Sequence, residues 1–148
     1  MEIIKGKTES TLIFIRFDPK EDLMDGLKKI IEQEHIAAGV VLSGIGCFAK
    51  CRIHQVDVSE TPDLLNRKQA YRELSGGWEI GSIQGIIADG EPHLHVTLSE
   101  GDKTVSGHLE PGSIVFTLIE LSILKADAAM HRVISAGPEK IKQLTKKE

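Results

Sequence analysis

The chain has 148 residues, of which 41% are hydrophobic, 27% charged and 4% aromatic, and its formal net charge is -4. This composition is typical of one globular domain with a core of Ile, Leu and Val. The acidic balance argues against a dedicated nucleic-acid binder. Because it contains neither a run of about 18 apolar residues nor a signal peptide, we expect a cytoplasmic protein with no membrane partner.

The N-terminal region is predicted to form two short strands and a helix. Residues 2–8 and 11–17 are strand-like and would pair through the Glu-Ser dipeptide between them, so that residues 1–10 form an N-terminal strand or arm. An acidic segment that contains proline comes next. After it, Leu23, Leu27, Ile30 and Ile31 follow the apolar spacing i, i+4, i+7, i+8. This spacing predicts an amphipathic helix that covers the core.

A glycine-containing motif follows a predicted buried strand, residues 37–42. Gly44, Gly46 and Ala49 match the loose dinucleotide-binding pattern G-x-G-x-x-A, which is meaningful only where a helix follows the strand. Residues 50–58 alternate like a strand instead. We therefore reject a dinucleotide site and expect a glycine-permitted turn or bulge between two strands.

Three side chains of chemical interest lie in or beside this second strand. We interpret His54 as a surface or interface histidine rather than as a ligand. Cys47 and Cys51 are the two cysteines of the chain. They would lie about 13 Å apart on a strand, which is too far for a disulfide, and we expect reduced and largely buried thiols.

The rest of the chain is predicted to contain mainly strands and turns. We expect a loop or short helical turn at residues 59–68, then strands at 69–74 and 78–88 with a turn at 75–77 between them. A turn at 89–92 precedes a histidine-rich hairpin, and a turn at 110–113 follows it. After these come a long strand at 114–124, a short strand at 128–133 and a lysine-rich helical tail at 138–148. Many strands and one helix predict a single α+β domain, residues 1–148, with a mainly antiparallel sheet. The long apolar strands also suggest burial at a subunit interface.

The segment from Pro92 to Leu109 is predicted to form a β-hairpin through a Gly-Asp turn. Apolar residues alternate with histidine, threonine and serine on both arms, so that one face is buried and the other is polar. A two-residue and a four-residue turn both lead to the same register. This register places His95 opposite His108 and His93 opposite Glu110.

His93, His95 and His108 would then form a compact triangle on the polar face. Three histidines with an open fourth position are typical of a catalytic-type zinc site, with Zn–N distances near ~2.0–2.1 Å. Imidazoles also suit other divalent transition metals. The alternative is a solvated strand face on which the histidines hold no metal.

Two glutamates are candidates for supporting roles around such a metal. Glu110, opposite His93, is the nearest acid–base candidate, and its alternative is a solvated residue at a strand end. Glu120 is the single acid in a long apolar strand, and this position suggests that it is buried. If it is buried it needs a partner, either as a hydrogen-bond acceptor for a ligand histidine or in a core salt bridge.

Four segments, in order and with matching gaps, resemble the plants-and-prokaryotes-conserved (PPC) domain family: Gly39 to Gly46, Trp78 to Gly85, Pro92 to His95 and Gly107 to Leu109. The resemblance covers roughly residues 13–133. It implies a stand-alone prokaryotic member with an α+β fold. In that fold, one main helix packs on a central, mostly antiparallel sheet of about seven strands, and the protein is a homotrimer.

The resemblance also bears on function. Plant members carry DNA-binding segments with an Arg-Gly-Arg core, which this chain lacks. The fold resembles that of acetolactate decarboxylase, which holds zinc through a His-x-His pair and a third histidine; His93, His95 and His108 match that pattern. We therefore expect a trimeric, metal-binding protein that is regulatory or DNA-associated without its own DNA-binding segment. The alternative is a small metal-dependent lyase or hydrolase.

Overall fold

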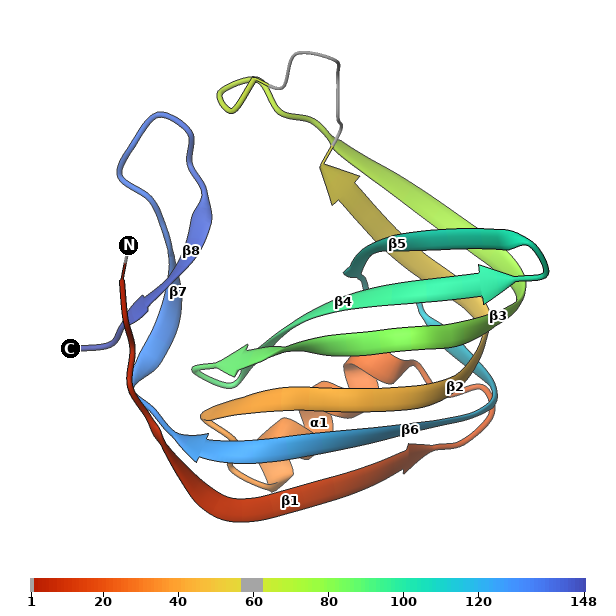
Figure 1. Ribbon diagram of the computed structural model, residues 1–148, viewed down its shortest axis with the longest axis horizontal. Helices are drawn as coiled ribbons and strands as arrows, with labels where there is room; N and C mark the ends of the chain where they lie inside the picture. The colour runs from red at the N-terminus through yellow and green to blue at the C-terminus, as the bar shows by residue number, and fades with distance from the viewer. Residues whose placement is uncertain (1, 57–62) are drawn as a thin grey trace.

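The computed structural model describes residues 2–56 and 63–148, which contain one helix and eight strands (Figure 1). In chain order these are β1 (Lys7–Phe17), α1 (Leu23–Gln33), β2 (Ala38–Val56), β3 (Gln69–Ala88), β4 (Glu91–Glu100), β5 (Lys103–Leu109), β6 (Ile114–Asp127), β7 (Met130–Ile134) and β8 (Lys142–Lys146). The predicted strand end at residues 57–58 and the first part of the predicted loop, 59–62, lie outside the described residues. Residues 63–68 form neither helix nor strand, as predicted.

Six strands form one sheet in the order β1-β6-β2-β3-β4-β5, and β7 and β8 form a separate two-stranded sheet. Every pairing between strands of the described chain is antiparallel. β5 also pairs with β2, so the strands from β2 to β5 close a ring of neighbours. The predicted antiparallel sheet is confirmed, with eight strands in two sheets instead of about seven in one.

The helix α1 packs against the sheet through the apolar stripe that its sequence predicts (Figure 1). Leu23 and Leu27 are fully buried and Ile31 is 4% exposed; each such burial contributes roughly 1.5–3 kcal/mol. The helix begins after Asp22, whose carboxylate accepts hydrogen bonds from two backbone N–H groups of the first turn. With 11 residues, α1 is too short to cross a membrane, and it is the one helix of the described residues.

Two predicted turns are replaced by continuous strands. Residues 43–46 lie within β2, and residues 75–77 lie within β3. Gly46 has a φ of +131° at a register shift against β6, where an added Cβ would collide with the Leu118 carbonyl. The bulge alternative is thus confirmed and the turns were wrong, because pairing with β6 holds β2 extended through Gly44 and Gly46.

Both ends of the chain differ from prediction. Residues 138–148 contain β8, which pairs antiparallel with β7, instead of a helical tail. Residues 2–6 form no strand, and β1 continues through Glu9 and Ser10 while it pairs with β6. In both regions the neighbouring strand decides the conformation, which local propensity predicts poorly.

The two cysteines are free and buried, as predicted. Burial raises the pKa of the Cys51 thiol to about 12. The pKa of Cys47 is also raised, mainly by burial and then by the nearby charge of Glu79. Both thiols therefore stay protonated near neutral pH and act as small apolar side chains of the core.

Candidate metal centre

The candidate site is built on the β4–β5 hairpin. Glu100 pairs with Lys103 around a two-residue loop, and the register continues to His95 opposite His108, as predicted. Leu94 is fully buried on the other face of β4. Since side chains alternate along a strand, the histidines extend from the face opposite the core.

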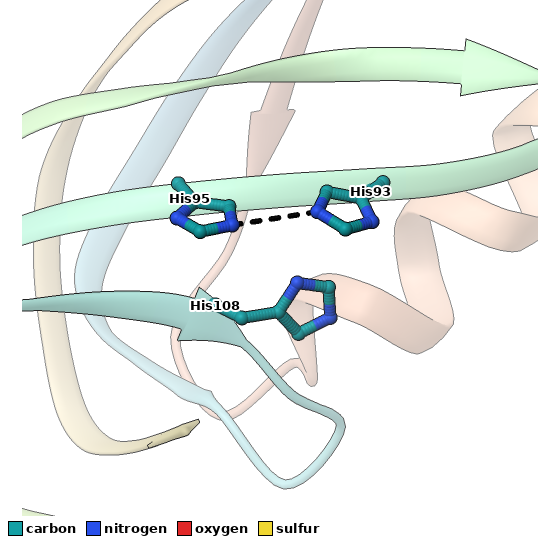
Figure 2. A group of neighbouring side chains, drawn as sticks. All are labelled: His93, His95 and His108. Atoms are coloured by element: carbon teal, nitrogen blue, oxygen red, sulfur yellow. Dashed lines mark hydrogen bonds between the residues drawn. The ribbon is translucent and has the colours of Figure 1, made fainter. Parts of the chain in front are cut away.

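Figure 2 shows His93, His95 and His108 facing one another. The Nε2 atoms of His93 and His95 are 3.3 Å apart, and the ring centroid of His108 lies 4.5 Å from that of His93 and 5.6 Å from that of His95. One nitrogen from each ring can be chosen so that all three lie within 4.8 Å of one another. Tetrahedral zinc requires nitrogens roughly 3.3 Å apart, so small side-chain movements would close the triangle around an ion.

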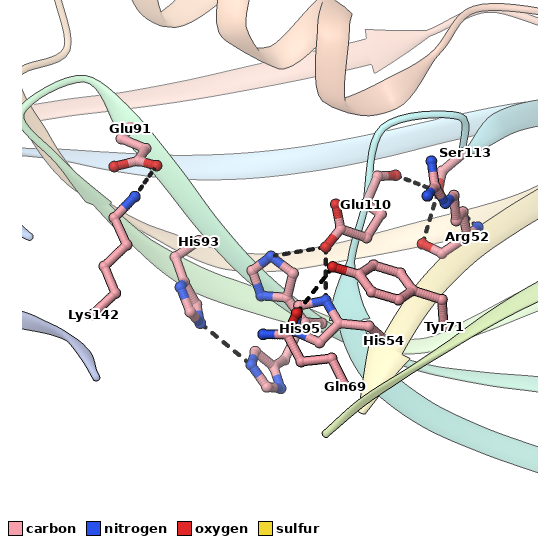
Figure 3. A network of polar contacts seen from close by, with 11 residues as sticks. Arg52, His54, Gln69, Tyr71, Glu91, His93, His95, Glu110, Ser113 and Lys142 are labelled. Carbon is pink, nitrogen blue, oxygen red and sulfur yellow. Dashed lines mark hydrogen bonds and ion pairs between the residues drawn. The ribbon is translucent and has the colours of Figure 1, made fainter. Parts of the chain in front are cut away.

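A fourth histidine joins the site from β2. His54 is paired with His108 across the β2–β5 contact, and their ring centroids are 4.6 Å apart. Nδ1 of His54 lies 2.6 Å from Oε1 of Glu110 (Figure 3). The same oxygen lies 4.0 Å from Nε2 of His108. His54, His108 and Glu110 thus form a second group whose possible ligand atoms lie within 4.8 Å of one another.

Glu110 does not form the predicted pair with His93. β5 ends at Leu109, and the backbone N–H of Glu110 donates a hydrogen bond of 2.9 Å to the carbonyl of Arg52 on β2. The chain therefore turns toward β2 after Leu109 instead of extending the hairpin ladder. This turn brings the carboxylate to His54 and to within 4.0 Å of His108.

Ser113 holds this turn in place from a fully buried position. Its Oγ accepts a hydrogen bond of 3.0 Å from the backbone N–H of Arg52 and donates one of 2.8 Å to the carbonyl of Glu110 (Figure 3). Asp22, the cap of α1, accepts a further hydrogen bond of 2.6 Å from the N–H of Gly112. The helix and β2 together therefore position the backbone that carries Glu110.

Sequence reasoning missed His54 as a member of the site. Alternation along a strand says nothing about which other strand lies beside it. Gly107 is the local signal that could have helped: an added Cβ there would lie 2.8 Å from the His54 carbonyl oxygen. A glycine inside a strand often marks such a close approach of another backbone.

The environment keeps two of the histidines neutral. Burial, followed by the charges of His93 and His54, lowers the pKa of His108 to about 4. Burial, followed by the charge of Arg132, also lowers the pKa of His93. A metal ion binds the neutral imidazole, so these two ligands need not lose a proton near neutral pH.

A cavity of about 590 Å³ opens beside the histidines, with all four of them in its wall. Its volume lies within the range of roughly 300–1,000 Å³ that is common for small-molecule sites. Side chains from β2, β3, β4, β5, β7 and β8 line it, and Figure 3 shows several of them. The arrangement leaves space for water or a ligand at a fourth coordination position.

Glu120 lies elsewhere, and the expectation that it is buried was wrong. It is exposed on β6, paired with Arg16 of β1 on one side and Ile45 of β2 on the other. Its neighbours Ile119 and Leu121 are buried, so alternation turns Glu120 outward. It lines a separate cavity of about 440 Å³, away from the histidines.

The model of the Plants and Prokaryotes Conserved (PCC) domain matches residues 5–127. The chain belongs to this family. The matched range contains His93, His95 and His108, as well as the segments that carry the resemblance in the sequence. It ends before β7 and β8, which add their own side chains to the cavity of this PCC-domain protein.

Comparison with curated proteins finds a similar segment in a longer protein. The bifunctional protein GlmU from Synechococcus sp. (strain JA-2-3B'a(2-13)) is 31% identical to the PCC-domain chain over 119 residues. The alignment covers 80% of this chain and 17% of GlmU. The chain therefore spans about a sixth of the length of this relative.

Solved structures share the fold at low sequence identity. The metal-containing protein AF0104 from Archaeoglobus fulgidus is 21% identical, with a TM-score of 0.82 and coverage of 99% of this chain and 100% of that one. A Bacteroides thetaiotaomicron protein, named only provisionally as DNA-binding, is 14% identical, with a TM-score of 0.76. The match covers 98% of this chain and 99% of that one. Bacillus subtilis alpha-acetolactate decarboxylase is 18% identical, with a TM-score of 0.55 and coverage of 76% and 51%, which confirms the predicted relation of the two folds.

Proposed function

We propose that this PCC-domain protein binds one divalent transition metal ion, zinc in the first place, through His93, His95 and His108. The observation that carries this proposal is the triangle of ring nitrogens within 4.8 Å of one another on two paired strands. The lowered pKa values of His93 and His108 support it, because both imidazoles are neutral near pH 7. The similar fold of a metal-containing archaeal protein is consistent with it.

The alternative function, a small metal-dependent lyase or hydrolase, is favoured by two specific features. The cavity opens over the histidines, whereas a purely structural metal would be enclosed by a fourth protein ligand. Glu110 lies 2.6 Å from His54 and 4.0 Å from His108, within reach of a proton at the site. When bound to three imidazoles, zinc polarises a carbonyl or lowers the pKa of a bound water to about 7. Glu110 and His54 would then accept and hold that proton.

The non-catalytic alternative is a regulatory or DNA-associated domain. The net charge of -4 supplies little neutralisation of phosphates, so any association with DNA would depend on an assembled surface or a partner. A mobility-shift titration separates these cases. Sequence-selective binding that persists as salt is raised would support a DNA role, whereas binding that fades with salt on any sequence would not.

We further propose that the chain forms a homotrimer. The supporting feature is an exposed apolar face on β1, β2 and β6, formed by Leu12, Phe14, Val40, Leu42, Ile45, Phe116 and Leu118, each at least 37% exposed. A large exposed apolar patch commonly marks a protein interface. The number of three subunits follows the family resemblance.

The metal proposal is tested by elemental analysis of untagged protein purified without chelator. We expect about one zinc or other transition metal ion per chain in the wild type and in His54→Ala, and none in His95→Ala. Absence of metal in the wild type even after reconstitution would overturn the site. If metal is lost from His54→Ala but retained in His95→Ala, the metal site is instead the group of His54, His108 and Glu110.

A further inference from the structure

The cavity beside the histidines is positively charged in an acidic protein. Arg67, Arg132 and Lys142 line it, and Glu91 is the one acidic residue among the described residues of its wall. A second carboxylate, Glu110, lies next to the cavity and faces His54. Three cations against one lining carboxylate contrast with the net charge of -4 of the whole chain. The charge of the cavity therefore favours an anionic ligand.

Arg132 is the cation best placed to hold such a ligand. It extends from β7, and its Nη1 and Nη2 each donate one hydrogen bond, of 3.2 Å to the Glu91 carbonyl and of 3.1 Å to the Ile86 carbonyl. A guanidinium has more N–H groups than these two bonds use, and no other acceptor is found for it within residues 2–56 and 63–148. The two backbone contacts fix the plane of the guanidinium at the wall of the cavity while donors remain for a ligand.

The position of Arg132 connects it to the histidine triangle. Its side chain and that of His93 line the same cavity. Arg132 donates to the carbonyl of Ile86, the residue of β3 that pairs with His93 on β4. A ligand held by Arg132 would therefore lie next to His93.

Lys142 and Glu91 form an ion pair at the same cavity. Nζ of Lys142, on β8, lies 2.5 Å from Oε1 of Glu91, on β4, and the two side chains are 50% and 53% exposed (Figure 3). An exposed ion pair of this kind contributes little to stability. Lys142 can thus exchange Glu91 for a ligand anion at small cost.

We propose that this cavity binds a small organic anion through a carboxylate or phosphate group held by Arg132, with its opposite end against His93, His95 and His108. Arginine binds both groups through paired N–H···O bonds, which also set the orientation of the ligand. A volume of about 590 Å³ accommodates a molecule of this kind. The inference rests on the proposed function in that it places the ligand beside the proposed metal ligands. Its cations come partly from β7 and β8, beyond the matched family range.

The test is calorimetric titration of metal-free protein with malonate and, separately, with inorganic phosphate. We expect saturable binding of at least one anion by the wild type and at least tenfold weaker binding by Arg132→Gln. Lys103→Gln removes the same charge from an exposed side chain at the start of β5 and should stay within twofold of the wild type. No saturable binding of either anion, or equal affinity in Arg132→Gln, would overturn the proposal. A preference between the two probes distinguishes a carboxylate ligand from a phosphate ligand.

A second variant guards against a purely structural effect, because Arg132 also joins β7 to the backbone of β3 and β4. Glu91→Gln keeps the backbone carbonyl that Arg132 contacts but removes the carboxylate that competes for Lys142. We expect severalfold tighter anion binding in Glu91→Gln. Unchanged or weaker binding in this variant would contradict an electrostatic anion site.

Metal content of the same preparations before chelation keeps the two proposals distinguishable. Arg132→Gln should retain the metal content of the wild type, since Arg132 is not a metal ligand. Anion binding without any metal in the wild type would contradict the metal site and leave the anion site standing. Metal in the wild type together with no anion binding would refute the anion site alone.

Discussion

His54 lies directly opposite His108 where β2 pairs with β5, and their ring centroids are 4.6 Å apart. The pairing joins the hairpin that carries the histidine triangle to a strand that is more than fifty residues away in the chain. It also brings the His54–Glu110 pair to the edge of the triangle. The contact depends on how closely the backbones of β2 and β5 approach.

Gly107→Ala should disrupt this contact. The added Cβ would lie 2.8 Å from the His54 carbonyl and 3.2 Å from the Ile53 side chain, so β5 would have to move away from β2. We expect a loss of about 1–3 kcal/mol in the free energy of unfolding, measured with urea, and weaker metal binding. Gly81→Ala is the matched control, because its added Cβ meets only the Thr97 carbonyl at an ordinary 3.5 Å. Equal effects of the two variants would contradict a special role for the β2–β5 approach.

Ser113→Ala should destabilise the turn that carries Glu110. The change removes the acceptor of the Arg52 N–H, in a partly buried hydrogen bond, and the donor to the Glu110 carbonyl. An unsatisfied buried group costs about 1–3 kcal/mol, so the urea midpoint should fall accordingly. Ser43→Ala removes an exposed hydroxyl paired with Ser122 and should change stability by less than about 0.5 kcal/mol. Similar midpoints for both variants would show that the turn does not depend on Ser113.

The stability of the metal-free protein should fall as the pH decreases from about 6.5 toward 4. The folded state lowers the pKa of His108 from 6.5 to about 4, so in this window the unfolded chain binds a proton that folded His108 does not. The free energy of unfolding therefore decreases as the pH falls through this window. Above pH 6.5, His108 is neutral in both the folded and the unfolded state and makes no pH-dependent contribution. We would measure the free energy of unfolding with urea at pH 7 and at pH 5. It should decrease less between these two pH values in His108→Asn than in the wild type. Identical decreases in both proteins would argue against the lowered pKa.

Phe14→Glu should dissociate the proposed trimer. Phe14 is 76% exposed in the single chain and lies on the apolar face of β1, β2 and β6. A buried, unpaired carboxylate at an interface is strongly unfavourable, so light scattering should report monomers. Ile134→Glu places the same charge at a 65% exposed residue of β7, outside that face, and should remain trimeric. A monomeric wild type would refute the trimer directly.

Local patterning in the sequence determined much of the site. The alternation in β4 and β5 and the Gly-Asp loop predict the hairpin, its buried face and the pairing of His95 with His108, all of which the structure contains. The apolar spacing of α1 likewise predicts its packed face. These features depend on residues no further apart in the chain than His95 and His108, where the geometry of strand, turn and helix leaves few alternatives.

Only the tertiary structure decided what surrounds the hairpin. The approach of β2 brings His54 to His108, the turn at Ser113 aims Glu110, and β7 and β8 carry Arg132 and Lys142 to the cavity. None of these contacts has a local pattern, because which strands become neighbours depends on burial over the whole sheet. For the same reason Glu120, which an apolar strand suggested to be buried, is turned outward by its register against β1 and β2.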